Sequence, residues 1–123
     1  MRIIAISTLR AFWIKHPDAK TQLQAWYALA SRAQWKSPSD IKVAYRNASF
    51  TANNRVVFNI KGNDYRLIVA VAYKLQIVYV KFVGTHKEYD EVKEDFGNFP
   101  NFGNIRRLET VAMIMVPVQY EDE

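Results

Sequence analysis

The chain has 123 residues, half of them hydrophobic, so it can bury one proper core but not two independent ones. The absence of cysteine excludes a disulfide framework, thiolate metal sites and a cysteine nucleophile, and it fits a reducing cytoplasm. The N-terminal apolar run is too short for a secretory signal, and no stretch approaches the roughly 20 apolar residues of a membrane span. We therefore expect a soluble, cytoplasmic protein that does not associate with membranes.

The formal net charge of +5 is distributed unevenly along the chain. Residues 1–87 contain 14 lysines and arginines against 3 acidic residues, whereas residues 88–123 contain 3 against 9. The first part therefore carries +11 and the second part −6. A compact body with this positive charge attracts phosphate backbone, which favours nucleic acid or the ribosome as the partner. The alternative is a basic domain that binds acidic partners.

The N-terminal half is predicted to be mainly helical. Residues 1–5 have the composition of a short strand, after which Ser7 can cap a helix that runs to about Lys15 and ends before Pro17. A second helix is expected over about 18–33, with one apolar stripe that needs a sheet to cover. The stripe consists of Leu23, Trp26, Tyr27, Ala30 and Ala33.

A short helical turn is expected between residues 36 and 48. Ser39 or Asp40 can cap it, and Val43 is its apolar residue. Arg46 then lies in the loop that leads out of this turn.

Three strands are predicted next, over Arg55–Lys61, Tyr65–Tyr73 and Gln76–Val83. Tight links at Gly62-Asn63 and Lys74-Leu75 would join them into an antiparallel meander. If both links are two-residue turns, the register is fixed. The expected pairs are Asn59 with Arg66, Val57 with Ile68, Ile68 with Lys81, Ala70 with Tyr79 and Arg66 with Val83.

The predicted register separates two faces of this sheet. One face is an apolar wall for the two helices, made of Val56, Phe58, Ile60, Leu67, Val69, Val71, Val78, Val80 and Phe82. The other face carries Arg55, Asn59, Lys61, Arg66, Tyr79 and Lys81. A basic outer face of this kind favours a concave surface that holds a polyanion, and the alternative is an ordinary solvated face.

A capped turn is expected directly after the last strand. Thr85 can cap a short helix with Glu88 at the capping-box position, which places His86 in the first turn. Because this turn begins beside Val83, the expected neighbour of Arg66, His86 and Arg66 could reach one phosphate group. Beyond Glu94 the sequence DFGNFPNFGN is typical of a loop, and VAMIMVPV near the C-terminus has the length and composition of a strand.

These residue types suit the cleavage of RNA without a metal or other cofactor. That reaction needs a base for the 2′-hydroxyl group, cations for the charge on phosphorus, and a proton donor for the leaving oxygen. His86 can exchange a proton near neutral pH, Arg66 and Lys61 can hold phosphate, and Tyr89 can orient or stack a base. The alternative for His86 is a helix-start residue that bonds nearby backbone. No HExxH motif, paired carboxylates or glycine-rich phosphate loop occurs, so we expect no metal site.

Several segments resemble the HigB toxins of the RelE-like ribonuclease group. They are AFWIKHPDA, LQAWYALASRAQWKSPSDIK, YRNASF, NRVVFNIKGNDYRLIVAVAY and IVYVKFVGTHKEYDEV, which together span about residues 1–93. The resemblance implies an α+β RelE-like ribonuclease fold, with two N-terminal helices on a small antiparallel sheet and a short helix after the last long strand. It also implies ribosome-dependent cleavage of mRNA and neutralisation by a HigA antitoxin.

Carried over residue by residue, the resemblance makes Arg66, His86, Tyr89 and Lys61 the catalytic candidates. The further RNA-binding candidates are Arg46, Arg55, Asn59, Tyr79, Lys81 and Lys87. The expected toxin domain covers residues 1–94, and residues 95–123 are an extension that departs from the family. We expect this extension to dock on an exposed sheet edge, within one chain or across a homodimer.

Other functions remain open at this stage. An RNA-binding or ribosome-binding module without catalysis would also carry a basic sheet and tyrosines. A structural or regulatory protein that adheres through its C-terminal extension is another alternative. The extension also fits an inactive toxin homologue.

Overall fold

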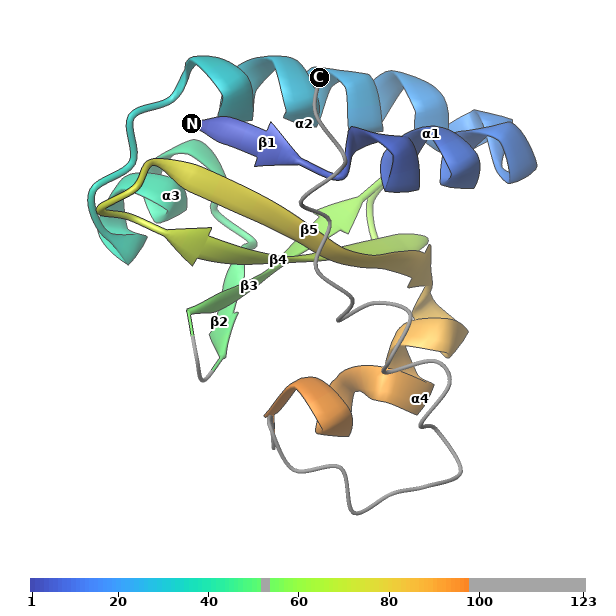
Figure 1. The fold of residues 1–123 in the computed structure, drawn as a ribbon. Helices are drawn as coiled ribbons and strands as arrows, with labels where there is room; N and C mark the ends of the chain where they lie inside the picture. The colour runs from blue at the N-terminus through green and yellow to red at the C-terminus, as the bar shows by residue number, and fades with distance from the viewer. Residues whose placement is uncertain (52–53, 98–123) are drawn as a thin grey trace.

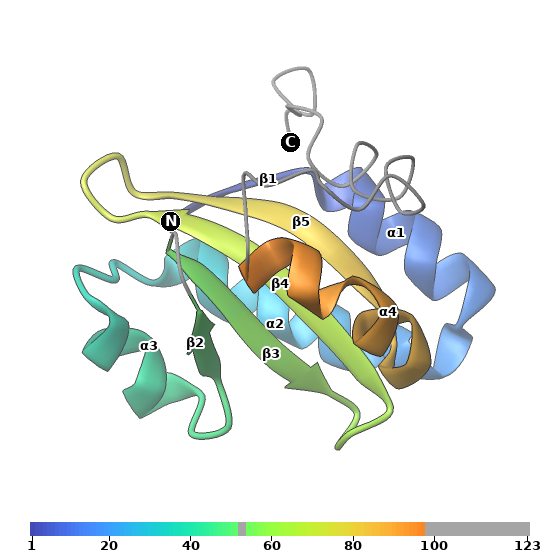
Figure 2. The same cartoon turned by 90° about the horizontal axis from the view of Figure 1, so that it is seen from below.

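The computed structural model describes residues 1–51 and 54–97, which form three layers around one sheet. Helices α1 (Ile6–Lys15) and α2 (Lys20–Arg32) cover one face, and α4 (His86–Gly97) lies against the other (Figures 1 and 2). This arrangement is an α+β fold compatible with that of RelE-like toxins. The loop predicted to begin at residue 95 starts later, because residues 95–97 belong to α4. The rest of that predicted loop and the apolar segment near the C-terminus lie outside the described residues.

The sheet is mixed, with the order β1-β5-β4-β3-β2. Its strands are β1 (Arg2–Ile4), β2 (Ser49–Thr51), β3 (Arg55–Ile60), β4 (Tyr65–Ala72) and β5 (Ile77–Thr85). The three predicted long strands and both tight links are confirmed. The expectation of a purely antiparallel sheet is wrong, because β1 pairs in parallel with the start of β5. Strand β2, which the sequence did not predict, pairs antiparallel with β3.

Both helices of the N-terminal half form where they are predicted, although their starts differ. Ala5, in the left-handed conformation with φ of 79°, occupies the N-cap of α1, so Ser7 lies inside the helix and does not cap it. A short 3₁₀ turn, η1 (Pro17–Ala19), precedes α2. The stripe on α2 is confirmed for its three most buried members, Leu23, Trp26 and Ala30.

The short third helix, α3 (Pro38–Ala44), begins earlier than expected. Ser37 occupies its N-cap, and Asp40 lies within the helix, where its carboxylate accepts the amide hydrogen of Lys36 at 2.8 Å. Neither Ser39 nor Asp40 is therefore the N-cap. Ile41 is the buried apolar residue of α3, whereas Val43 is 84% exposed.

A β-bulge shifts the register between β4 and β5. Val69 lies opposite Val80, but Ile68 lies opposite Phe82, so Lys81 is the extra residue. The predicted partners of Ile68 and Arg66 were therefore wrong by one position, and Arg66 lies opposite Gly84. The remaining predicted pairs, on the β3 side and near Tyr79, are confirmed.

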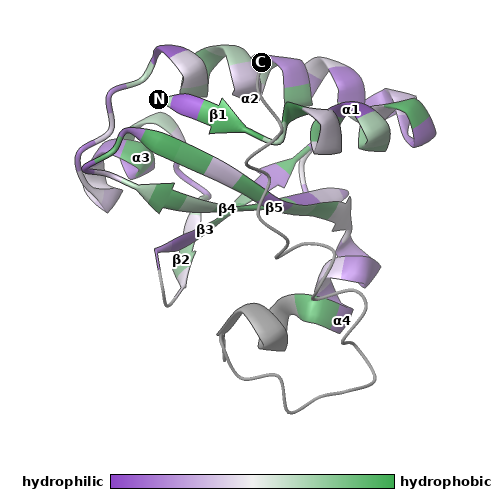
Figure 3. Cartoon of the chain, in the orientation of Figure 1, coloured by the Kyte–Doolittle hydropathy of each residue, from purple (hydrophilic) through white to green (hydrophobic). Residues whose placement is uncertain are grey.

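Two apolar clusters lie on the two sides of the sheet. The larger one joins α1 and α2 to the inner face and contains Val56, Phe58, Ile60, Leu67, Val69, Val71, Val78 and Val80 among its members. The smaller one lies under α4 and contains Val57, Ile68, Phe82 and Val92. Because the bulge reverses the side on which residues point, Phe82 belongs to the outer cluster and not to the predicted inner wall. Figure 3 shows the strands largely apolar and the helices mixed.

Candidate active site

The outer face of the sheet consists of three rows that cross β3, β4 and β5. Strand pairing places Asn59, Arg66 and Gly84 in one row, which we call the proximal row because it adjoins the start of α4. The next row is apolar and contains Val57, Ile68 and Phe82. The third, the distal row, contains Arg55, Ala70 and Tyr79, with Lys81 beside it at the bulge.

Arg66 is anchored within the proximal row. Its Nη1 donates to the carbonyl of Asn63 at 2.9 Å and to that of Tyr65 at 3.3 Å. Its guanidinium carbon lies 5.7 Å from the ring centroid of Tyr89 on α4, a cation–π contact. The guanidinium has five N–H donors in a planar fork, so this anchoring of one end fixes its plane for phosphate.

His86 is the first residue of α4. Its backbone amide donates to the carbonyl of Asp64 at 3.1 Å, and its Nδ1 lies 3.1 Å from the carboxylate of Asp90. Both side chains are about half exposed. A carboxylate at Nδ1 favours the tautomer with the proton on that nitrogen, which leaves Nε2 as the proton acceptor.

The helix start that presents His86 is held by the predicted capping box. The amide of Thr85 donates to the Glu88 carboxylate at 2.8 Å, and the amide of Glu88 donates to the Thr85 hydroxyl at 3.1 Å. Two otherwise unpaired helix-start donors are thus satisfied. The position of His86 therefore depends on local sequence as well as on the sheet.

Gly84 allows α4 to approach the sheet at this point. A Cβ atom there would lie 2.5 Å from the ring of Phe82 and 2.8 Å from the carboxylate of Glu88. Any other residue would displace one of these groups. The closeness of Arg66 and α4 thus requires glycine opposite Arg66.

Helix α4 covers the apolar row, which corrects the expectation of an uncovered basic face. Val92 is buried in the outer cluster and Tyr89 packs against it. The bulge creates this seat by turning Phe82 outward. The basic groups consequently lie on either side of an apolar strip and do not form one continuous surface.

The distal row brings Arg55, Tyr79 and Lys81 together. Arg55 is only 7% exposed, and burial lowers its pKa. Burial, followed by the positive charge of Arg55, lowers the pKa of Lys81. The Lys81 ammonium lies 5.5 Å from the ring centroid of Tyr79. The distal row therefore places two cations close together beside an aromatic ring.

Of the other RNA-binding candidates, Asn59 belongs to the proximal row, whereas Arg46 and Lys87 lie outside both rows. Arg46 and Asn59 line one hollow at the edge of β3, together with Tyr45, Asn47, Ala48, Phe58 and Gly62. Lys87 is exposed in the first turn of α4, next to His86.

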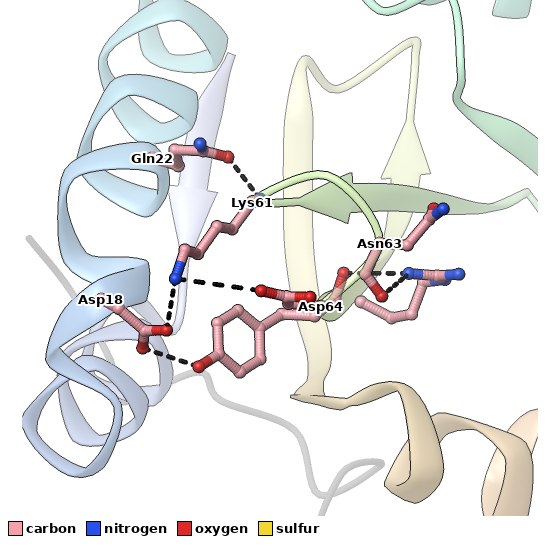
Figure 4. A network of polar contacts seen from close by, with 7 residues as sticks. Asp18, Gln22, Lys61, Asn63 and Asp64 are labelled. Atoms are coloured by element: carbon pink, nitrogen blue, oxygen red, sulfur yellow. Dashed lines mark hydrogen bonds and ion pairs between the residues drawn. The ribbon is translucent and has the colours of Figure 1, made fainter.

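Lys61 lies on the helix side of the β3–β4 turn and contacts the helical layer (Figure 4). Its ammonium group lies 2.8 Å from the carboxylate of Asp18 in η1 and 3.9 Å from that of Asp64. The hydrogen bond to Asp18 raises the pKa of Lys61, and the same contact is the first cause that lowers the pKa of Asp18. The structure therefore groups Lys61 with Asp18, whereas Arg66 contacts Tyr89.

Three residues near the candidate site were missed by sequence reasoning. Asp90 had a usable signal, because residues four apart on a helix share one face and His86 and Asp90 have that spacing. Gly84 and Asp18 had none, since their roles depend on a β-bulge and on a contact that spans 43 residues.

In the described residues, 1–51 and 54–97, no three histidine or acidic side chains gather as a group that could hold a metal ion. No helix in the same part of the chain has the length and apolar character needed to cross a membrane.

The sequence is similar to known toxins. Residues 19–92 match the HigB_toxin family, described as the RelE-like toxic component of a toxin-antitoxin system. The mRNA interferase toxin HigB of Escherichia coli strain K12 is 30% identical over 92 residues, which cover 73% of this chain and 88% of the relative. The mRNA interferase HigB of Shigella flexneri has the same identity and coverage. The mRNA interferase HigB of Escherichia coli O6:H1 is 24% identical over 94 residues, covering 75% and 91%.

Proposed function

Because the chain belongs to the HigB family of RelE-like toxins, we propose that it is an endoribonuclease that cuts mRNA as the toxin half of a toxin-antitoxin pair. The observation that carries the proposal is the cation–π contact of Arg66 on β4 with Tyr89 on α4, the helix that begins at His86. A fixed cation, an imidazole and an aromatic ring there match the needs of RNA cleavage.

In the proposed reaction, Nε2 of His86 accepts the proton of the 2′-hydroxyl group as its oxygen attacks the adjacent phosphorus. Asp90 stabilises the resulting imidazolium. Arg66 binds the non-bridging phosphate oxygens, where negative charge grows in the transition state. The bond from phosphorus to the 5′-oxygen breaks, water protonates that oxygen, and the products are a 2′,3′-cyclic phosphate and a 5′-hydroxyl end. Tyr89 positions a base next to the phosphate by stacking.

The distal row gives the RNA a second point of contact. We assign Arg55, Lys81 and Tyr79 to a neighbouring stretch of the RNA backbone and its bases. Arg46, Asn59 and Lys87 contribute to binding at the margins. Of the four catalytic candidates, Lys61 is given the smallest part in binding phosphate, because its ammonium group pairs with Asp18.

The decisive test compares Arg66→Ala with Arg66→Lys and with the control Arg10→Ala, which removes an exposed arginine from α1. We expect Arg66→Ala to lower the cleavage rate by about 10²-fold to 10³-fold, the usual effect of removing a group that stabilises transition-state charge. Arg66→Lys should recover only part of the lost cleavage rate, since lysine lacks the planar fork of donors that arginine has. Unchanged cleavage in Arg66→Ala would move the active site elsewhere.

The ribosome, a HigA-type antitoxin and a cytoplasmic setting complete the proposal. A ribosome that presents mRNA in a fixed path would supply alignment of the substrate. Purified protein should then cut translated mRNA far faster than the same RNA free in solution. Equal cutting of both RNAs would contradict the proposed dependence on the ribosome, but it would leave the proposed nuclease activity standing.

An RNA-binding module or inactive homologue is the second candidate, and the departure of residues 95–123 from the family favours it. We propose that residues 1–94 form the toxin domain and that residues 95–123 are an extension through which the protein forms a homodimer. A protein without catalysis would keep ribosome binding and give no cleaved ends on primer extension of translated mRNA. The mass in solution of the whole chain and of a chain ending at Gly97 tests the dimer.

A further inference from the structure

The β3–β4 turn, residues Lys61–Asp64, carries backbone groups that hold the candidate site. The carbonyl of Asn63 accepts from the Arg66 guanidinium at 2.9 Å, and the carbonyl of Asp64 accepts from the His86 amide at 3.1 Å. These two carbonyls set the plane of the guanidinium and the start of α4. A shift of this turn would therefore move both proposed catalytic groups together.

The turn is built from an unfavourable backbone conformation. Lys61 has φ of 52° and Gly62 has φ of 64°, so two consecutive residues are left-handed. Glycine adopts this conformation readily, but lysine does not. Contacts from outside the hairpin are consequently needed to hold Lys61 in place.

The junction of η1 and α2 supplies those contacts (Figure 4). One carboxylate oxygen of Asp18 accepts from the Lys61 ammonium at 2.8 Å, and the other accepts from the Tyr65 hydroxyl at 2.6 Å. The side-chain oxygen of Gln22 accepts the backbone amide of Lys61. Asp18 thus holds both ends of the turn, Lys61 at its start and Tyr65 directly after it.

We infer that Asp18 is a positioning residue, which holds Arg66 and the start of α4 in register by clamping the β3–β4 turn onto the helical layer. The inference rests on the proposed function, in which Arg66 and His86 act on one phosphate. Misplacement of such groups by a fraction of an ångström lowers the rate of a reaction that depends on orientation. Asp18 does this without touching RNA.

The clamp is expected to affect catalysis more than stability. Asp18 and Lys61 are 45% and 42% exposed, and exposed pairs contribute little to folding. Tyr65, by contrast, is buried and its ring packs against Phe12 at 5.2 Å. Tyr65→Phe therefore removes the hydroxyl group and leaves the ring in its packing.

The experiment measures steady-state cleavage of translated mRNA by Asp18→Asn, Tyr65→Phe and the double variant. Asp40→Asn is the matched control, since it makes the same charge change on α3. We expect Asp18→Asn to lower kcat by about tenfold with KM within about twofold of the parent. Tyr65→Phe should lower kcat less, and the double variant should fall short of the product of the two, because both act through one turn.

Amide hydrogen exchange of the whole chain gives a second readout that needs no activity. Loosening of the turn should speed exchange at the His86 amide in Asp18→Asn and not in Asp40→Asn. Parent-like cleavage together with parent-like exchange at His86 would overturn the inference. A faster Asp18→Asn enzyme would also overturn it, since Lys61 would then be a catalytic cation that Asp18 restrains. If the parent protein cut no RNA, the proposed function would be contradicted. The exchange comparison would still test whether Asp18 holds the β3–β4 turn in place.

Discussion

Gly84 stands opposite Arg66 in a space that has no room for a side chain. Gly84→Ala should lower the free energy of unfolding by about 1–3 kcal/mol, the usual range for overpacking. It should also displace the Glu88 carboxylate and speed exchange of the Thr85 amide. Urea denaturation and amide exchange measure the two effects.

Gly62→Ala is the control for backbone strain without crowding. No atom lies within 4 Å of the position that its Cβ would take, although its φ of 64° is left-handed. The free energy of unfolding should fall by about 1–2 kcal/mol, without direct displacement of the Glu88 carboxylate. If Gly84→Ala matched this pattern, the close approach of α4 would not matter.

The pH dependence of Asp18 follows from the direction of its pKa shift. Hydrogen bonds from Lys61 and then Tyr65 lower the pKa of Asp18 below its ordinary 3.8. A depressed carboxyl pKa contributes stability that is present above the ordinary value and is lost as the pH falls through the lowered one. Asp18→Asn should therefore be less stable than the parent at neutral pH and converge with it in acid. A pH-independent gap between their urea midpoints would contradict this.

The candidate site was predictable to different degrees, for reasons that differ by residue. His86 could be placed because the capping box is a local pattern, and Arg66 because hairpin register carries it opposite Asn59. Lys61 was assigned to catalysis on its charge and on the family resemblance, and neither showed its contact with Asp18. Contacts between distant segments depend on how the layers pack, which periodicity does not encode.

At the level of elements, α4 depends on a capping box that spans four residues. Thr85→Ala should cost about 1 kcal/mol, a typical value for losing an N-cap hydroxyl group. It should also weaken cleavage, because His86 lies in the turn that loosens. Thr21→Ala, on an exposed position of α2, is the control and should change stability by less than about 0.5 kcal/mol. Equal losses in both would show that the cap contributes nothing.

The strands themselves were predictable from alternating apolar residues, and the bulge was not. A run such as Val78, Val80 and Phe82 keeps the two-residue period, which gives no sign that Lys81 is an insertion. The bulge is stabilised by tertiary packing, because it places Phe82 beside Ile68 on the outer face, where Val92 of α4 packs against them. That benefit becomes visible only once α4 is known to fold back onto the sheet.

At the scale of the molecule, the charge of +11 on residues 1–87 makes RNA affinity depend on salt. The logarithm of the binding constant should fall linearly with the logarithm of salt concentration. Arg66→Ala should reduce the slope by about 0.7, the value for one phosphate contact on single-stranded nucleic acid. Arg10→Ala, on the opposite face, should leave the slope unchanged. Equal slopes for Arg66→Ala and the parent would mean that Arg66 binds no phosphate.

The parallel pairing of β1 with β5 has a consequence for the order of events during synthesis. Arg2 pairs with Ile77, so β1, the first strand to leave the ribosome, can pair only after β5, the last strand of the described residues, has been made. Arg66 also pairs with Gly84, two residues before His86, only when β5 is in place. Contacts so distant along the chain form late. We expect the nascent protein to remain harmless to the ribosome that makes it until most of its own message has been translated.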